Sequence, residues 1–217
     1  MQRKQFLRCL GVALGSASVG PLLSACGGGG TSAPGAAAPD PVADLSAEEV
    51  AGLLFMREEE KLAHDVYVAL FGLWGAQVFT NIADSETEHT EAVRQLILAH
   101  GLEDPAATTL PGVFVDASLQ ALYDQLVAQG TPSLVEALKV GCLIEEKDIQ
   151  DIELEKAQVA DEPDIVQVYD RLLCGSRNHL RAFSRTLTNQ GGSYTPVFLS
   201  QAQWDAIAGS EQESCGG

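Results

Sequence analysis

The sequence predicts an all-α fold in which four long helices form a bundle, with a long crossover between the second and the third. Apolar residues recur at helical spacing in four stretches of the chain. Capping residues bound these stretches. The connection over residues 102–130 is long enough to cross the bundle instead of turning straight back. An apolar content of 46 % suits a globular core.

The first helix is expected over residues 46–73, because Ser46 and Glu49 form a capping box and Gly75 follows its end. Glu60 interrupts the apolar stripe of this helix. Glu59 lies on an adjacent apolar stripe, so periodicity alone does not choose between the two glutamates. Glu58, which precedes them, is expected to point more toward solvent.

The second helix is expected over residues 78–100, ended by Gly101. It carries Glu86 and His89, which project from one face as an oxygen and a nitrogen ligand because they are three residues apart. A lone Glu-x-x-His is a weak signal, since helices carry many solvated Glu and His residues. The motif indicates a metal site only if other helices supply further ligands. His100, at the helix end, is expected to cap carbonyls.

A short amphipathic helix is expected inside the crossover, around residues 119–128. The third long helix is expected to begin at Thr131 and Pro132, with proline at the first helical position. Glu145 lies within the apolar stripe of this helix.

The fourth helix is expected after a turn at residues 160–163 and runs to about residue 188. Its inner face includes Ser176 and His179. A small helix capped at Ser200 is expected in the chain that follows.

The first and second long helices are expected to form one hairpin, and the third and fourth another. At a rise of about 1.5 Å per residue, the inward polar residues of each hairpin fall within roughly 6 Å of one another along the helix axis. If the hairpins are aligned, one layer receives five candidate metal ligands: Glu60, Glu86, His89, Glu145 and His179. Three isolated carboxylates in an apolar layer would be costly without protons, cations or a metal. The alternative is that each polar group is satisfied by its own neighbours.

Residues 1–25 have the character of a signal peptide, because basic residues flank an apolar stretch and no acidic residue occurs before Asp40. The stretch ends in Leu23-Ser24-Ala25-Cys26, which resembles a bacterial lipobox with Cys26 as the lipidated residue. Arg3 and Lys4 begin a stretch similar to a twin-arginine export motif, with lysine in place of the second arginine. The expected organisation continues with a lipidated, flexible tether over residues 26–45, a helical domain over 46–208 and a tail over 209–217.

The formal net charge is −17, and removal of the three basic residues of the signal would take it to −20. Such a charge argues against nucleic acid as a partner. Outside the signal and the lipobox the chain has Cys142, Cys174 and Cys215, an odd number that argues against a complete disulfide framework. Cys142 and Cys174 are expected to be core residues.

The helical motifs resemble those of the ferritin-like superfamily. Residues 60–67 look like the first-helix pattern Glu-x-x-Ala-x-x-x-Tyr, and residues 83–89 look like the second helix of rubrerythrins. Across residues 46–208 the chain is similar to an uncharacterised bacterial and archaeal ferritin-like family, domain of unknown function 2202. Residues 56–63, 144–149 and 175–183 carry this second resemblance.

The resemblance implies a ferritin-like bundle that binds one or two iron ions, or manganese. It favours Glu60 over Glu59 and implies Glu86 as a bridging carboxylate. Ser176 departs from the family pattern, because di-iron relatives usually have a second Glu-x-x-His there. A site that binds only one metal ion is therefore an alternative. The remaining candidates, as alternative ligands or as residues supporting the ligands, are Glu59, His64, Tyr67, Glu146, Asp148 and Ser176.

Two functions are expected from these residues. The first is a metal-dependent ferroxidase or a protein that reduces peroxide or oxygen, exported and lipid-anchored to the bacterial cell envelope. The second is a non-enzymatic bundle that buffers or senses metal, or presents the crossover to an envelope partner. A zinc hydrolase is a weaker third option, since no nucleophile or general base stands out. The membrane, an unidentified electron donor and a second copy of the chain as a homodimer are the expected partners.

Overall fold

The computed structural model describes residues 45–216. The predicted signal peptide, the predicted lipidation site Cys26 and all of the predicted tether except Leu45 lie outside the described residues. Within the described part, no helix combines the length and the apolar character needed to cross a membrane.

The described residues form six helices and no strands, so the all-α prediction is confirmed. The number exceeds four because the short segment in the crossover and the segment after Ser200 are helices as well. The helices are α1 (Ala47–Trp74), α2 (Gln77–Ala99), α3 (Ala117–Gly130), α4 (Leu134–Gln158), α5 (Pro163–Asn189) and α6 (Gln201–Ala208).

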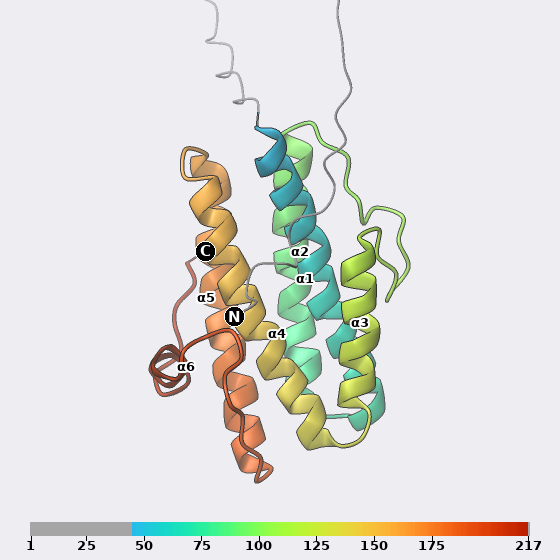
Figure 1. The fold of residues 1–217 in the computed structure, drawn as a ribbon, viewed down its shortest axis with the longest axis vertical. Helices are drawn as coiled ribbons and strands as arrows, with labels where there is room; N and C mark the ends of the chain where they lie inside the picture. The colour runs from blue at the N-terminus through green and yellow to red at the C-terminus, as the bar shows by residue number, and fades with distance from the viewer. Residues whose placement is uncertain (1–44, 217) are drawn as a thin grey trace, which may run out of the picture. The chain divides into compact units, whose positions relative to one another are not determined.

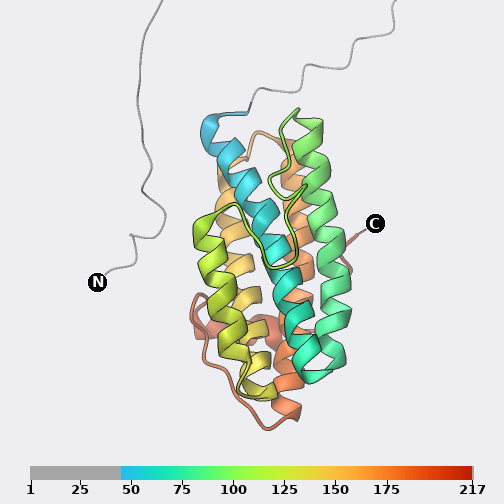
Figure 2. The ribbon, with the colours of Figure 1, turned by 90° about the vertical axis from the view of Figure 1, so that its right-hand side faces the viewer.

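The four longest helices lie side by side, as Figures 1 and 2 show from two directions. Contacts join α1 to α2, α4 to α5, α1 to α4 and α2 to α5, so each of the four touches two others. Helix α3 packs on α1 and α4, and α6 packs on α5. The colours in Figure 1 show α1 and α2 running in opposite directions, and the crossover returns the chain so that α4 runs in the same direction as α2.

The helix ends follow the expected local chemistry. Ser46 and Glu49 form the capping box of α1, and Gly75 ends that helix in the left-handed conformation, with a φ of 61°. The expected start of the third long helix at Pro132 is wrong. The N-cap is Ser133, whose hydroxyl accepts a hydrogen bond from the backbone N–H of Glu136, so the first helical residue is Leu134, two residues later than expected.

Aromatic packing joins α1, α2 and α5 next to the layer of polar residues. The ring centroids of Tyr67 and Phe183 lie 5.0 Å apart, and those of Phe79 and Phe183 lie 5.5 Å apart. Gly141 of α4 makes room for this cluster, because a Cβ there would lie 2.5 Å from the Phe183 ring. These contacts fix the depth at which α4 and α5 meet α1.

Buried charges on α1 hold the crossover in place. Arg57 pairs with Asp104, with 3.1 Å between Nε and Oδ1. Glu58 accepts hydrogen bonds from the backbone N–H groups of Val115 and Asp116, at 2.6 and 2.9 Å. The expectation that Glu58 points toward solvent is therefore wrong: its residue is 3 % exposed, because the crossover covers it.

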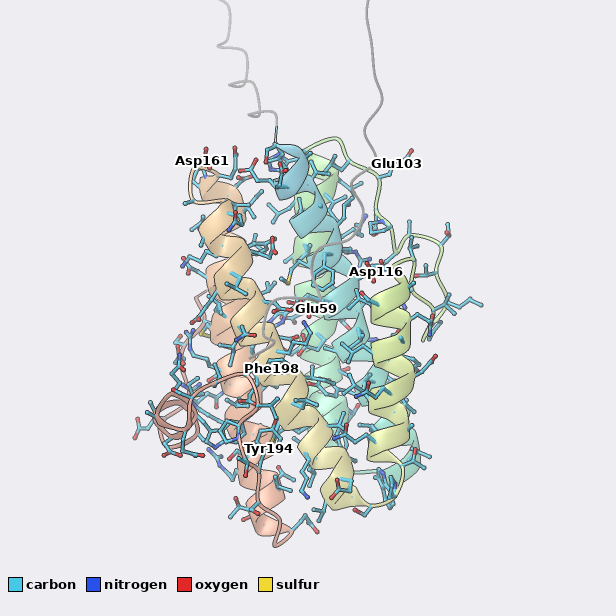
Figure 3. All side chains as sticks on the ribbon, in the orientation of Figure 1. Glu59, Glu103, Asp116, Asp161, Tyr194 and Phe198 are labelled. Atoms are coloured by element: carbon cyan, nitrogen blue, oxygen red, sulfur yellow. A yellow bond between two sulfur atoms is a disulfide. The ribbon has the colours of Figure 1, made fainter. Side chains whose placement is uncertain are left out.

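The segment after α5 is attached to the helices in two ways. Glu146 of α4 accepts hydrogen bonds from the Tyr194 hydroxyl and from the backbone N–H of Val197, in the stretch labelled by Tyr194 and Phe198 in Figure 3. Further along, Cys215 forms a disulfide with Cys174.

Cys174 is buried, as expected of a core residue, but the disulfide was not predicted. Its partner lies in the tail, whose path helical periodicity does not determine. Cys142 is buried and has a free thiol, as expected.

Candidate metal centre

The five residues predicted to share a layer come together in the structure. Glu60 comes from α1, Glu86 and His89 from α2, Glu145 from α4 and His179 from α5. All three carboxylate side chains are at most 1 % exposed. The imidazoles of His89 and His179 are 12 and 9 % exposed, so the histidines are the part of the cluster nearest to solvent.

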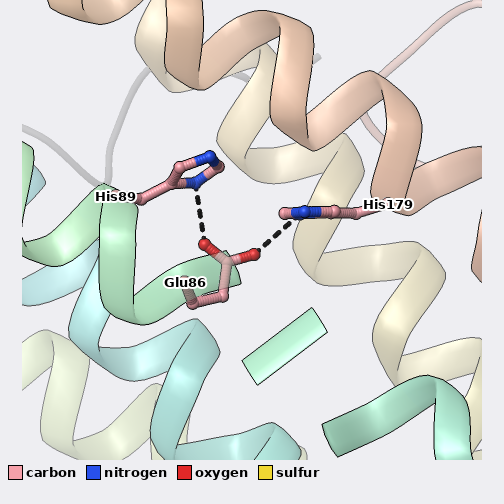
Figure 4. Close-up of side chains that lie close together, drawn as sticks. All are labelled: Glu86, His89 and His179. Atoms are coloured by element: carbon pink, nitrogen blue, oxygen red, sulfur yellow. Dashed lines mark ion pairs between the residues drawn. The ribbon is translucent and has the colours of Figure 1, made fainter. Parts of the chain in front are cut away.

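Glu86 lies between the two histidines, as Figure 4 shows. Its Oε2 is 2.9 Å from Nδ1 of His89, and its Oε1 is 2.8 Å from Nδ1 of His179. The contact between Glu86 and His89 results from their spacing of three residues on one helix. The second depends on the packing of α2 against α5.

Each of the other two carboxylates lies near a different histidine. Oε2 of Glu60 is 3.3 Å from Nδ1 of His89, and Oε2 of Glu145 is 3.4 Å from Nδ1 of His179. The cluster therefore consists of two groups of three ligands each, and the two oxygens of Glu86 belong to one group each. Glu86, His89 and His179 also offer ligand atoms that all lie within 4.8 Å of one another.

Several of the oxygen and nitrogen atoms that could bind a metal face one another but do not form hydrogen bonds. Both oxygens of Glu86, Oε1 of Glu60, Oε2 of Glu145 and Nδ1 of His179 are buried and complete no hydrogen bond, although all of them except Oε1 of Glu60 lie 2.8 to 3.4 Å from an oppositely charged partner atom. Buried polar atoms without a partner are costly, yet here they converge from four helices. Converging oxygen and nitrogen lone pairs are what a bound cation requires, so this donor set fits a metal ion.

Other buried carboxylates nearby have structural partners. Glu58 and Glu146 accept backbone N–H groups, and Glu59 pairs with Lys147 at 2.8 Å. Figure 3 marks Glu59 about halfway along the helices, away from Asp161 at the α4–α5 turn. Glu58, Glu59 and Glu146 are therefore held by other groups.

Asp148 was a candidate for an additional carboxylate ligand. It lies one helical turn after Glu145 and is 3 % exposed. Burial raises its pKa well above the usual value, and the charges of Glu59, Glu145 and Glu60 raise it further. Asp148 is thus a buried acid close enough to Glu145 and Glu60 for their charges to raise its pKa. The Ser176 hydroxyl donates to the carbonyl of Leu172.

The charges of the cluster shift its pKa values in opposite directions. Burial raises the pKa of Glu60 to about 7, although a hydrogen bond with His89 opposes this. Burial would also raise the pKa of Glu86, but the charges of His179 and His89 outweigh it and hold that pKa well below the usual value. Burial would lower the pKa of His179, but Glu86 and Glu145 raise it to about 10. Protonated imidazoles therefore balance the carboxylates at neutral pH, and a metal would have to displace these protons.

Two further side chains hold the candidate ligands in place. The Tyr67 hydroxyl donates to Oε1 of Glu145 at 2.6 Å, in line with its expected supporting role. Ser85, which sequence reasoning missed, has its hydroxyl 2.9 Å from Nε2 of His179 and so leaves Nδ1 directed at Glu86. The only sequence signal for Ser85 is its position directly before Glu86. His64 lies apart, with its side chain 33 % exposed and paired with Asp65.

Gly175 of α5 makes room for the imidazole of His89, because a Cβ at this position would lie 2.4 Å from Nε2. We expect Gly175→Ala to displace His89 and to weaken metal binding about tenfold, the lower end of what a supporting position contributes. Calorimetric titration of the metal-free protein with Co(II) measures this change.

The matched control is Gly72→Ala on α1, where no atom lies within 4 Å of the added Cβ. Both substitutions favour helix by up to about 1 kcal/mol. Only the Gly175 variant is expected to lose affinity. Equal affinities of the two variants would contradict the positioning role of Gly175.

A second acidic group lies where α1 begins and the α4–α5 turn closes. Glu49, Asp161 and Glu162 offer oxygens within 4.8 Å of one another. Glu49 is already engaged in the capping box of α1, and Asp161 is exposed. This group contains no histidine and lies at the helix ends, so it is set apart from the buried cluster.

The fold and the site define an all-helical protein with a buried carboxylate–histidine cluster suited to metal. Residues 49–211 match the family described as "Uncharacterized protein domain (DUF2202)", and the chain belongs to this family. It is 45 % identical over 173 residues to the uncharacterized protein MJ0754 of Methanocaldococcus jannaschii, covering 80 % of this chain and 93 % of the relative. The crystal structure of hypothetical protein MJ0754 from the same archaeon is similar, with a TM-score of 0.77 and 44 % identity over 81 % of this chain and all of that one.

Proposed function

We propose that α1, α2, α4 and α5 form a ferritin-like four-helix bundle that holds two metal ions. Glu60 and His89 would bind one ion, Glu145 and His179 the other, and Glu86 would bridge them. The observation that carries the proposal is the placement of Glu86, with one oxygen 2.9 Å from His89 and the other 2.8 Å from His179. The order of the helices and the parallel course of α2 and α4 support the ferritin-like comparison.

Iron is the proposed metal, with manganese as the alternative. Mixed carboxylate and imidazole donors suit these ions, whereas thiolate ligands would favour softer metals. The free Cys142 is buried, and burial raises the pKa of its thiol, which disfavours the thiolate. The loss of a carboxylate at Ser176 is offset by Asp148 in this proposal.

The proposed activity is oxidation of Fe(II) by oxygen or peroxide. Bound iron would supply open coordination positions and electrons for this reaction. The chain itself would hold the ligands and exclude bulk water, since the carboxylates are almost completely buried. Tyr67 would keep Glu145 oriented through its hydroxyl, and Ser85 would keep Nδ1 of His179 available.

The proposed setting is the bacterial envelope. There the signal peptide over residues 1–25 would be removed and a lipid on Cys26 would anchor the tether. The electron donor would be a further envelope component. This part of the proposal rests on the sequence alone.

Oxygen uptake tests the activity. We expect the Fe(II)-loaded domain from Leu45 onward to consume oxygen or hydrogen peroxide in proportion to bound iron. Oxygen and peroxide electrodes measure the uptake, and the same protein loaded with Zn(II) is the control, since zinc has no redox chemistry. Metal binding without uptake of either oxidant would instead support the buffering or sensing alternative.

A further inference from the structure

A pocket of about 700 Å³ lies between α2 and α5, and both His89 and His179 line it. This volume is within the range of small-molecule sites. The histidines are also the most exposed members of the candidate metal cluster, while its carboxylates are buried. The pocket therefore meets the cluster on its histidine side.

The lining indicates which molecules fit this pocket. Apart from the two histidines, its charged residues are Arg171 and Glu88, which carry opposite signs. The side chain of Asn178 adds amide groups, and Ala92 and Ala182 leave open space. A pocket without a dominant charge suits a neutral ligand with hydrogen-bonding oxygens, and its volume leaves room for more than a diatomic molecule.

The outer wall of the pocket comes from the end of the chain. Gln212, Cys215 and Gly216 line it, and they belong to residues 210–216, which we call the C-terminal strap. The strap lies along α5, since Glu213 pairs with Arg177 and with Arg181.

Two more attachments hold the strap at the pocket. Asn178 donates to the backbone carbonyl of Glu213 at 3.0 Å. Cys174 and Cys215 form a disulfide, with 5.4 Å between their Cα atoms. The Arg177–Glu213 pair is partly exposed, with side-chain exposures of 28 and 33 %, and such ion pairs contribute little. The disulfide is covalent and persists until it is reduced.

We propose that this pocket is the binding and access site for a neutral hydroperoxide, hydrogen peroxide or a small organic one, and that the disulfide-locked strap limits access to it. The inference rests on the proposed function and adds the site at which the oxidant would bind and a means of regulation. A dithiol reductant would unlock the strap: it donates two electrons and two protons, the Cys174–Cys215 bond breaks to give two thiols, and the dithiol becomes a disulfide.

Chemical modification of the metal-free, full-length protein tests access without requiring metal. Hydroxyl radicals oxidise imidazoles whether or not these are protonated, and mass spectrometry measures the rate at each histidine. We expect Ala92→Trp, which fills the pocket, to slow modification of His89 and His179 about tenfold. The exposed Ala99→Trp, seven residues further along α2, should leave both rates unchanged. His64, with its side chain 33 % exposed and outside the pocket lining, is the internal reference.

The strap is tested in the same assay. Cys215→Ser, and separately reduction of the unaltered protein with dithiothreitol that is removed before labelling, should accelerate modification of His89 and His179 about tenfold, with His64 unchanged. Dithiothreitol should have no further effect on Cys215→Ser. Unchanged rates in Ala92→Trp would overturn the access route, and unchanged rates after both reduction and Cys215→Ser would overturn the role of the strap.

A second assay separates this inference from the proposed function. Tert-butyl hydroperoxide consumption is measured with the iron-loaded protein and its variants. If the unaltered protein consumes none, the proposed activity is contradicted while the modification rates still decide the access route. If it consumes the hydroperoxide, we expect Ala92→Trp to be about tenfold slower than Ala99→Trp. Equal consumption by the two tryptophan variants would overturn the pocket as the substrate site.

Discussion

Replacing Glu86 by glutamine is expected to abolish stoichiometric metal binding. The change keeps the shape of the side chain but removes the charge and one of the two acceptor oxygens that face His89 and His179. Loss of a supporting group alone costs about 10- to 100-fold in metal affinity, so loss of the shared ligand should cost at least about 100-fold. Anaerobic titration with Fe(II), followed by metal analysis of the desalted protein, measures the effect.

The control is Asp84→Asn, which removes one negative charge from the same helix, two residues earlier. Asp84 is exposed, whereas Glu86 is 1 % exposed. The control should bind metal as the unaltered protein does, because it changes only the surface charge. Full metal binding by Glu86→Gln would show that Glu86 is a buried ion-pair partner of the histidines and no ligand.

The second large effect is on the stability of the metal-free protein, which we expect to fall as the pH rises from 5 to 8. Burial raises the pKa of Glu59 to about 8, although Lys147 opposes this, and raises that of Glu60 to about 7. Between their unfolded and folded pKa values the folded state holds more protons than the unfolded state, so the free energy of unfolding decreases with pH. The raised pKa of His179 acts in the same direction, because its contribution is fully present below its unfolded pKa and is lost as the pH approaches about 10.

The lowered pKa of Glu86 does not oppose this trend above pH 5, because its stabilising effect is lost only as the pH falls below the usual glutamate range. We expect a loss of about 3 kcal/mol between pH 5 and 8, or about 10 °C in Tm. Saturating metal should remove or reverse the trend, since binding becomes stronger as the ligands lose protons. Thermal unfolding followed by circular dichroism at several pH values measures both trends.

Glu60→Gln should flatten the pH dependence of the metal-free protein, since it removes one carboxyl with a raised pKa. The exposed Glu103→Gln should leave it unchanged. Stability that is constant or increases from pH 5 to 8 without metal would contradict the raised pKa values of Glu59, Glu60 and His179.

Much of this architecture follows from local sequence. Ser46, Gly75 and Ser200 bound helices through hydrogen bonds and backbone conformations within a few residues, so their roles can be predicted without the rest of the chain. Glu86 and His89 share a face because of helical geometry alone. The depth argument worked for Glu145 because each hairpin turn fixes the offset of its two helices.

Other features depend on contacts between distant segments. Glu58 is buried because the crossover folds over α1 and directs the backbone N–H groups of Val115 and Asp116 at it, a path that periodicity does not encode. The same reason hid the pairing of Cys174 with Cys215, since the strap has no regular pattern. His100 was expected to cap carbonyls, but Nε2 of its imidazole lies 3.0 Å from a carboxylate oxygen of Asp164 at the start of α5.

Anomalous X-ray diffraction from crystals loaded with Fe(II) under anaerobic conditions tests the central claim most directly. We expect two strong peaks per chain at the iron edge, one between Glu60 and His89 and one between Glu145 and His179, with Glu86 reaching both. No peak at these positions, or a peak only at the acidic group of Glu49, Asp161 and Glu162, would contradict a metal centre built on Glu86.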